Sequence, residues 1–251
     1  MEHYAPAQQV FVAGLIFARL GAILMLIPGI GETYVPARVR LALALVMTLA
    51  LFPVLSPGAE ALPTSSGDMA GVIIRETLIG LMIGAILRMF MAVLAVTGEI
   101  VSIQTTLSFA QTANPGQAQP SATLATFLGL FALVLVFSAN LHHMFIGAIV
   151  RSYSLFPFHK MVPTADAVQL AVQTMSRAFS LGVQLSAPVM VFAFIFNIAT
   201  GLVGRVMPQF QVFFVASPLL VLTTLSVFAL SLGVIGMVFL DRYRDLIRVF
   251  A

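Results

Sequence analysis

Apolar and polar positions follow one another along this chain in long blocks. Apolar segments occupy residues 10–30, 41–55, 69–97, 122–150, 178–203 and 210–240, approximately. A helix needs about 20 apolar residues to cross a bilayer, so the pattern predicts six candidate spans, of which the second is short. The third, fourth and sixth are long enough to tilt, kink or project beyond the bilayer. The expected fold is therefore all-α, a polytopic membrane protein with long, kinked or broken helices and helical hairpins.

Prolines interrupt this pattern inside the apolar blocks or at their ends. They are Pro28, Pro53, Pro188, Pro208 and Pro218. Each removes a backbone donor and favours a break or a bend. Bent or broken helices within a membrane are tolerated where they lie inside protein or along a cavity. We therefore expect helices that are not uniform rods.

A polar stretch, residues 102–123, separates two of the apolar blocks. It is rich in Ser, Thr, Gln and Asn and contains no Lys, Arg, Asp or Glu. Its first part keeps helical spacing of apolar positions at Ile100, Ile103 and Leu107. Asn114-Pro115-Gly116 and then Pro120 prevent the helix from continuing. A short amphipathic piece followed by a flexible tip is expected.

Two interpretations of this stretch remain open from the residues alone. It is either a surface connection between two helices or a neutral lining or plug of a conduit, in which uncharged groups do not hold a passing charged substrate tightly. In the second interpretation it is a candidate gate loop. The candidate gate residues are Ser108, Phe109, Gln111, Asn114, Pro115, Gly116 and Gln117.

Composition excludes several other classes of protein. Hydrophobic residues make up 60% of the 251 and charged residues 8%, which indicates an integral membrane protein. The net charge is +3, but the basic residues are scattered singly, so we expect no nucleic-acid binding. No cysteine is present, and the adjacent His142 and His143 cannot both ligate one metal, so neither metal nor cofactor is expected. No HExxH, GxSxG or Ser/His/Asp spacing indicates an enzyme.

The positive charges conflict with a simple topology. Arg38 and Arg40 follow the first block, while Arg242, Arg244 and Arg248 lie in the C-terminal tail. Basic segments favour the cytoplasmic side, yet six crossings would place these two segments on opposite sides. Either one apolar segment is a re-entrant hairpin, or the protein is not held in the bilayer in the usual way.

Charged and small residues share one face of the third block. Glu76, Gly80, Gly84 and Arg88 follow one another at intervals of four, and the two glycines permit another backbone to approach. Glu76 and Arg88 are too far apart to pair with each other, and Arg19 is the candidate partner of Glu76. A structural ion pair is the favoured role, and a proton-coupling carboxylate is the alternative.

Several segments in the same order resemble the FliR family, the export-gate membrane proteins of the flagellar type III secretion system. They are residues 19–21, 28–31 and 35–40, then Glu76, Gly80 and Gly84, then residues 98–104, 107–110 and 114–115, then 141–143, 156–157 and 187–188, and last 201–209, 212–213 and 218–219. The segment from Arg205 through Pro208 and Gln209 to Phe213 is the most specific.

The resemblance implies a non-enzymatic subunit of a hetero-oligomeric export gate in the bacterial inner membrane, within the flagellar basal body. The implied partners are FliP, FliQ, FlhB and FlhA, unfolded flagellar export substrates and membrane lipid. It implies an assembly largely outside the plane of the bilayer, with residues 1–165 FliP-like and residues 166–251 a FliQ-like hairpin with a basic tail. It also implies that the loop at 102–123 lies across the closed channel. The alternatives are a small-molecule or ion secondary transporter, or the equivalent subunit of a virulence secretion system.

Overall fold

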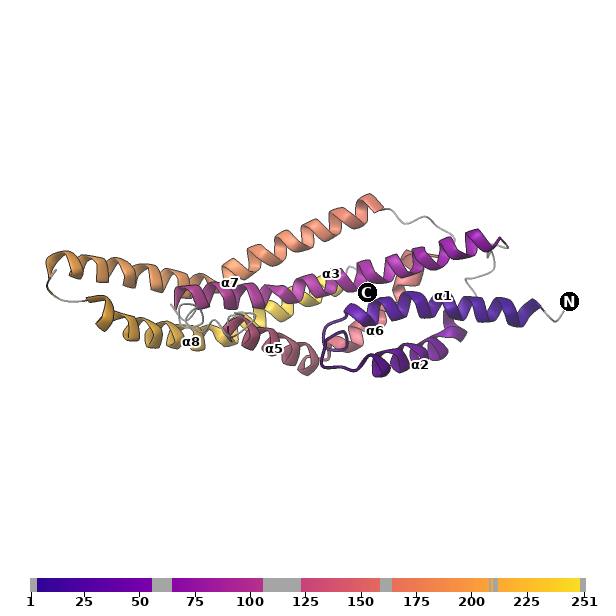
Figure 1. Cartoon of the computed structure of the whole chain (residues 1–251), viewed down its shortest axis with the longest axis horizontal. Coiled ribbons are helices and arrows are strands. Elements are labelled where there is room, and N and C mark those ends of the chain that lie inside the picture. Colours follow the sequence, from indigo (N-terminus) through magenta and orange to yellow (C-terminus); the bar gives the residue numbers. More distant parts are fainter. Residues whose placement is uncertain are drawn as a thin grey trace, which may run out of the picture. The chain divides into compact units, whose positions relative to one another are not determined.

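The computed structural model describes residues 4–55, 65–105, 123–158, 164–207, 209 and 212–248. These residues form helices and no strand, which confirms the all-α expectation (Figure 1). The helices are α1 (Tyr4–Leu26), α2 (Ala37–Leu55), α3 (Ser66–Gln104), α5 (Thr123–Ser138), α6 (Leu141–Leu155), α7 (Thr164–Val206) and α8 (Val212–Arg248).

The apolar blocks correspond to these helices with one important difference. Five helices are long and apolar enough to cross a membrane, and the fourth expected span is a bent pair, α5 and α6, with an angle of 76° at the break. Asn140 lies at the break in the left-handed conformation, with φ of 57°. A right-handed helix cannot continue through that conformation, and Asn adopts it more readily than most residues. The expectation that the fourth segment is kinked or broken is therefore confirmed.

Most prolines do not interrupt the helices in which they lie. α2, α7 and α8 continue through Pro53, Pro188 and Pro218, so the helices are not broken at these positions, and the other expected outcome, a bend, stays a prediction. One missing donor leaves the other hydrogen bonds of a long helix in place, and an apolar environment favours keeping them. Pro28 follows the end of α1 at Leu26. Pro208 lies outside the described residues.

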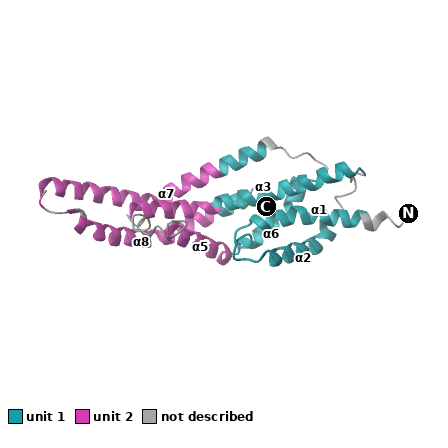
Figure 2. Cartoon of the chain, in the orientation of Figure 1, with its two compact units in different colours: residues 1–90, 140–174, 243–251 teal, residues 91–139, 175–242 magenta. Residues whose placement is uncertain are grey.

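The chain divides into two compact units (Figure 2). Unit 1 consists of residues 1–90, 140–174 and 243–251, and unit 2 of residues 91–139 and 175–242. Neither unit is a continuous stretch of sequence, because α3, α7 and α8 each contribute to both.

In unit 1, α1 supplies a fully buried core that packs on the first part of α3. Leu15, Ile16, Leu20 and Ile23 have 0% exposure or close to it, as do Ile79 and Ile83 of α3. The end of α8 joins this core through Tyr243, whose hydroxyl donates to the Leu87 carbonyl at 3.2 Å and whose ring stacks on Phe90 at 5.5 Å. Residues from both ends of the sequence thus share one core.

In unit 2, small residues bring backbones together. A Cβ on Gly98 of α3 would lie 2.5 Å from the Ala125 Cα of α5, and one on Gly182 of α7 would lie 3.1 Å from the Val93 carbonyl oxygen. The Thr97 hydroxyl contacts the Gly182 carbonyl at 3.2 Å. These close contacts are neutral and depend on the lack of side-chain volume.

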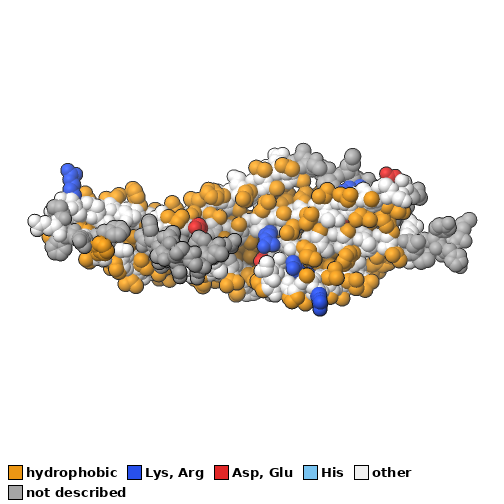
Figure 3. Space-filling model, in the orientation of Figure 1, with side chains coloured by type: hydrophobic (Ala, Val, Ile, Leu, Met, Phe, Trp, Pro, Cys, Tyr) orange, Lys and Arg blue, Asp and Glu red, His pale blue; other side chains and the backbone are white. Residues whose placement is uncertain are grey.

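Large apolar side chains are also widely exposed. Within the apolar windows of the candidate spans, 50% of the residues of α3 are buried but only 11% of those of α2 and α7. Figure 3 shows hydrophobic side chains across much of the visible face, with few charges among them. A face of this kind is covered by lipid or by other protein in its natural setting.

Candidate functional site

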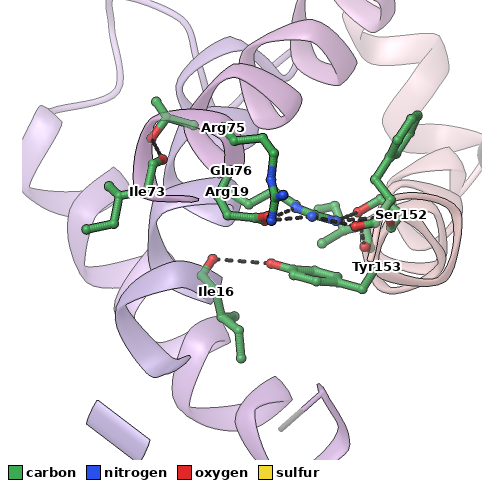
Figure 4. Close-up of polar contacts among 10 residues, drawn as sticks. Ile16, Arg19, Ile73, Arg75, Glu76, Ser152 and Tyr153 are labelled. Atoms are coloured by element: carbon green, nitrogen blue, oxygen red, sulfur yellow. Dashed lines mark hydrogen bonds and ion pairs between the residues drawn. The ribbon is translucent and has the colours of Figure 1, made fainter. Parts of the chain in front are cut away.

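A buried cluster in unit 1 is centred on Arg19 of α1 (Figure 4). The Arg19 side chain is 0% exposed, and its Nε donates to Glu76 Oε2 at 2.6 Å. Nη1 donates to the Ser152 carbonyl at 2.9 Å, and Nη2 to the Phe156 carbonyl at 2.7 Å. Each nitrogen of the guanidinium therefore has an acceptor, which is the condition for burying this charge.

Two of these acceptors belong to the C-terminal end of α6. The last carbonyls of a helix have no partner within the helix and carry partial negative charge. Ser152 O and Phe156 O lie at this end, and the Phe156 N–H also donates to Ser152 O at 2.9 Å. Arg19 therefore caps α6 while it pairs with α3, and it joins three helices.

Aromatic rings enclose the same guanidinium. Arg19 Cζ lies 4.1 Å from the centroid of the Tyr153 ring and 5.7 Å from that of Phe158. The Tyr153 hydroxyl donates to the Ile16 carbonyl at 3.3 Å, which ties α6 directly to α1. A cation over a ring face, away from water, adds to the stability of the pair.

The glycines of the sequence pattern allow α1 and α3 to come this close. A Cβ on Gly80 would overlap the Arg19 carbonyl oxygen and lie 2.7 Å from Ala22 Cβ. A Cβ on Gly84 would lie 2.8 Å from Leu26 Cβ. Both residues face α1, so the Glu76, Gly80 and Gly84 face is a helix contact.

Arg88 has a different partner. Its Nη2 lies 3.7 Å from Glu32 Oε2, and the two side chains are 46% and 31% exposed. A pair with this exposure contributes little stability. The structure therefore brings Arg19 and Glu76 together, and places Arg88 elsewhere.

The cluster contains a second arginine that sequence reasoning did not single out. Arg75 Nη2 lies 3.7 Å from Glu76 Oε1, and its side chain is 21% exposed. Ser152, Tyr153, Phe156 and Glu32 were also missed as partners. The available signal was the donor count of Arg19, because one carboxylate cannot satisfy five N–H groups.

The candidate gate residues, Ser108 to Gln117, lie outside the described residues, as does Pro208. α3 continues through Ile100 and Ile103 to Gln104, and Thr105 follows in a turn. Arg205 is exposed in the last turn of α7, and Gln209 is exposed in a turn. The gate loop therefore stays a prediction.

The two adjacent histidines lie at the start of α6, with ring centroids 4.2 Å apart. Among the described residues, no group of three or more His, Cys, Asp or Glu could hold a metal ion. The buried charges of the cluster are instead placed to hold helices together.

Known proteins match this chain over nearly its whole length. The family described as bacterial export proteins, family 1, matches residues 10–246. The flagellar biosynthetic protein FliR of Caulobacter vibrioides is 55% identical over 250 residues, which is 100% of each chain. FliR of Escherichia coli is 28% identical over 87% of this chain and 83% of its own length. FliR of Bacillus subtilis is 27% identical over 89% of this chain and 87% of its own length.

Proposed function

The chain belongs to the FliR family of flagellar export proteins, and on that premise we propose that it helps to form and close the conduit of the flagellar type III export gate. The family is non-enzymatic, and the chain is a membrane protein of the bacterial inner membrane with several candidate spans.

The observation that carries the proposal is the contrast between buried charge and uncovered apolar surface. Arg19 and Glu76 are fully buried within unit 1, whereas α7 exposes Phe179, Phe194 and Leu202 by 61%, 66% and 61%. Helices of this kind are stable when neighbours cover them. We propose FliP, FliQ, FlhB and FlhA as the neighbours, with residues 1–165 as the FliP-like part and residues 166–251 as the FliQ-like part.

The geometry of the cluster favours a structural role for Glu76. Its carboxylate is 0% exposed and is held by Arg19 at 2.6 Å. A proton-coupling carboxylate exchanges protons with water, which this burial opposes. We therefore favour the structural ion pair over a secondary transporter.

The bent pair supports one of the two explanations of the charge conflict. If α5 and α6 form a re-entrant pair, the five remaining helices cross. Four crossings, those of α2, α3, α7 and α8, then lie between the two basic segments. Because four is an even number, the residues after α1 and the C-terminal tail lie on the same side. This agrees with the positive charges at Arg38, Arg40 and the tail.

Shortening the chain from Ala110 to Gln119 tests closure. The flanking helices α3 and α5 begin and end outside this range, so assembly with FliP should be retained. Leakage of ions or small solutes across the membrane should rise, because the proposed stop at Phe109 would lose the movable tip beside it. A shortened protein that assembles in a membrane as tight as wild type would show that the stretch is only a connection.

Expression without partners tests the assembly itself. The isolated chain should be unstable, since its apolar faces would lack their neighbours. A well-behaved monomer that unfolds cooperatively in mild detergent would contradict this expectation. Recovery of FliP and FliQ with the tagged full chain would support it.

A further inference from the structure

We propose that Arg75 and the exposed face beside it form a docking site for an apolar helix of another membrane subunit, and that this helix carries a carboxylate which pairs with Arg75. The inference rests on the proposed function, because it takes the chain to be one subunit of a membrane assembly. It identifies one surface and the chemistry of its occupant.

The charges of the cluster are unbalanced. Two guanidinium groups, those of Arg19 and Arg75, face the single carboxylate of Glu76 (Figure 4). Arg19 is 2.6 Å from this carboxylate and takes it as a full hydrogen-bond partner, whereas Arg75 remains at 3.7 Å. Buried charges are normally paired, so the described residues of the cluster supply one negative charge too few.

Arg75 also has unused donors. Its Nε and Nη2 are buried and have no hydrogen-bond partner among the described residues, and neither has Glu76 Oε1. The side chain as a whole is 21% exposed, so the proposed pairing requires the guanidinium to turn outward, because Nε and Nη2 are themselves covered by this chain. A second carboxylate would supply both the missing charge and the missing acceptor.

The surface next to Arg75 fits a helix. Gly71, Ile74, Leu78 and Leu81 recur at helical spacing along α3. The three apolar side chains are 60%, 58% and 39% exposed, and a Cβ on Gly71 would meet nothing within 4 Å. Arg75 lies four residues after Gly71 and three before Leu78, so it borders this face.

An apolar helix fits this surface better than a lipid headgroup. The exposed apolar side chains of this face lie on the same helix as Arg75, and they need an apolar neighbour along the whole face. A phospholipid could supply a phosphate for the charge and acyl chains for the apolar side chains, so the open space beside Gly71 is the observation that favours a helix. Gly71 would also allow a neighbouring backbone to approach closely.

The experiment measures how much of the full chain is recovered in complex with its neighbours from membranes. Three variants are compared with wild type: Arg75→Gln, Gly71→Leu and Arg88→Gln. Arg88 is the matched control because it lies on the same helix and has its partner, Glu32, within the chain. Gly71→Leu keeps the charge of Arg75 and blocks the approach of the neighbouring helix. The chain itself has room for the new side chain.

Arg75→Gln and Gly71→Leu should each lower the amount of complex recovered about tenfold. In Arg75→Gln the neighbour's carboxylate loses its charged partner, and in Gly71→Leu the new side chain keeps the neighbouring helix away. Arg88→Gln should stay within about twofold of wild type. Resistance of the chain to protease should be unchanged in all three. A charge reversal, Arg75→Glu, should be rescued by an acidic-to-basic replacement on a neighbouring subunit.

Other outcomes would overturn the inference. Wild-type recovery with both Arg75→Gln and Gly71→Leu would leave Arg75 without a role in docking. If recovery is unchanged and the purified protein retains phosphatidylglycerol only when Arg75 is present, the partner of Arg75 is a lipid phosphate. Loss of protease resistance in Arg75→Gln but not in Gly71→Leu would assign Arg75 to the packing of this chain itself. If wild type recovers no FliP or FliQ, the proposed function fails instead.

Discussion

Units 1 and 2 are held together by different chemistry. In unit 1, a charged guanidinium links α1, α3 and α6, with all of its nitrogens satisfied within the unit. In unit 2, close contacts at Gly98 and Gly182 join α3 to α5 and α7 without any charge. The charged cluster fixes one geometry, because each misplaced helix would leave a buried charge unpaired.

The neutral contacts of unit 2 are more permissive. Packing at glycine depends on the absence of a side chain, and it gives a surface that several helices could match. Unit 2 also contains strongly exposed apolar side chains, among them Leu230 at 85% and Val215 at 74%. Unit 1 also exposes apolar side chains, such as Leu49 of α2 at 64%. The difference between the units therefore lies in what fixes their internal packing, which is charge in unit 1 and close packing without charge in unit 2.

The largest expected effect comes from breaking the ion pair of unit 1. Glu76→Gln should destabilise the protein by about 3–5 kcal/mol, because Arg19 would stay buried without a counter-charge. The readouts are the amount of protein recovered in membranes and its assembly with FliP, the proposed partner. An intact complex that has lost only a proton-coupled flux would overturn the structural role.

A double-mutant cycle provides the control for this prediction. Arg19→Gln and Glu76→Gln should be coupled by at least about 1 kcal/mol in thermal unfolding in mild detergent, because each change removes the same interaction. Additive effects would show that the two side chains act independently.

The second prediction probes the close contact of unit 2. Gly98→Ala should destabilise the protein by about 1–3 kcal/mol, because the new Cβ would lie 2.5 Å from Ala125 Cα and α5 would have to move. Gly129→Ala in α5 is the matched control, since a Cβ there meets nothing within 4 Å. Equal melting temperatures for the two variants would contradict the role of Gly98.

A smaller effect is expected at the polar contact between α3 and α7. Thr97→Val keeps the shape of the side chain and removes its hydrogen bonds to the Val93 and Gly182 carbonyls. We expect a loss of about 0.6 kcal/mol, the usual size for a hydrogen bond between helices in a membrane. Thr97→Ser should stay near wild type in the same thermal measurement, and a loss equal to that of Thr97→Val would exclude the hydroxyl as the cause.

The smallest effect is expected at the exposed pair of unit 1. Glu32→Gln should change stability by less than about 0.5 kcal/mol, because Glu32 and Arg88 are 3.7 Å apart and partly in water. Added salt should remove even this difference. A loss of stability comparable to that of Glu76→Gln would mean that the difference in burial between the two ion pairs does not set how much each one contributes.

The sequence alone determined the class of the protein and most of its helices. Long apolar blocks require helices in a membrane, because backbone groups there must satisfy one another, and the blocks correspond to α1, α2, α3, α7 and α8. The regular spacing of Glu76, Gly80 and Gly84 indicated a helix contact, because residues four apart share a face. The motifs also carried the resemblance to the family.

Tertiary structure decided what no local pattern contains. The acceptors of Arg19 are carbonyls of Ser152 and Phe156, more than a hundred residues away, and every residue has a carbonyl, so sequence identity cannot mark them. The bend at Asn140 interrupts one of the apolar blocks. The hydropathy of a block does not show the backbone conformation of a single residue within it. Arg75 precedes Glu76 in the sequence, but only the structure shows that its Nη2 lies 3.7 Å from the Glu76 carboxylate and that its Nε and Nη2 have no hydrogen-bond partner among the described residues.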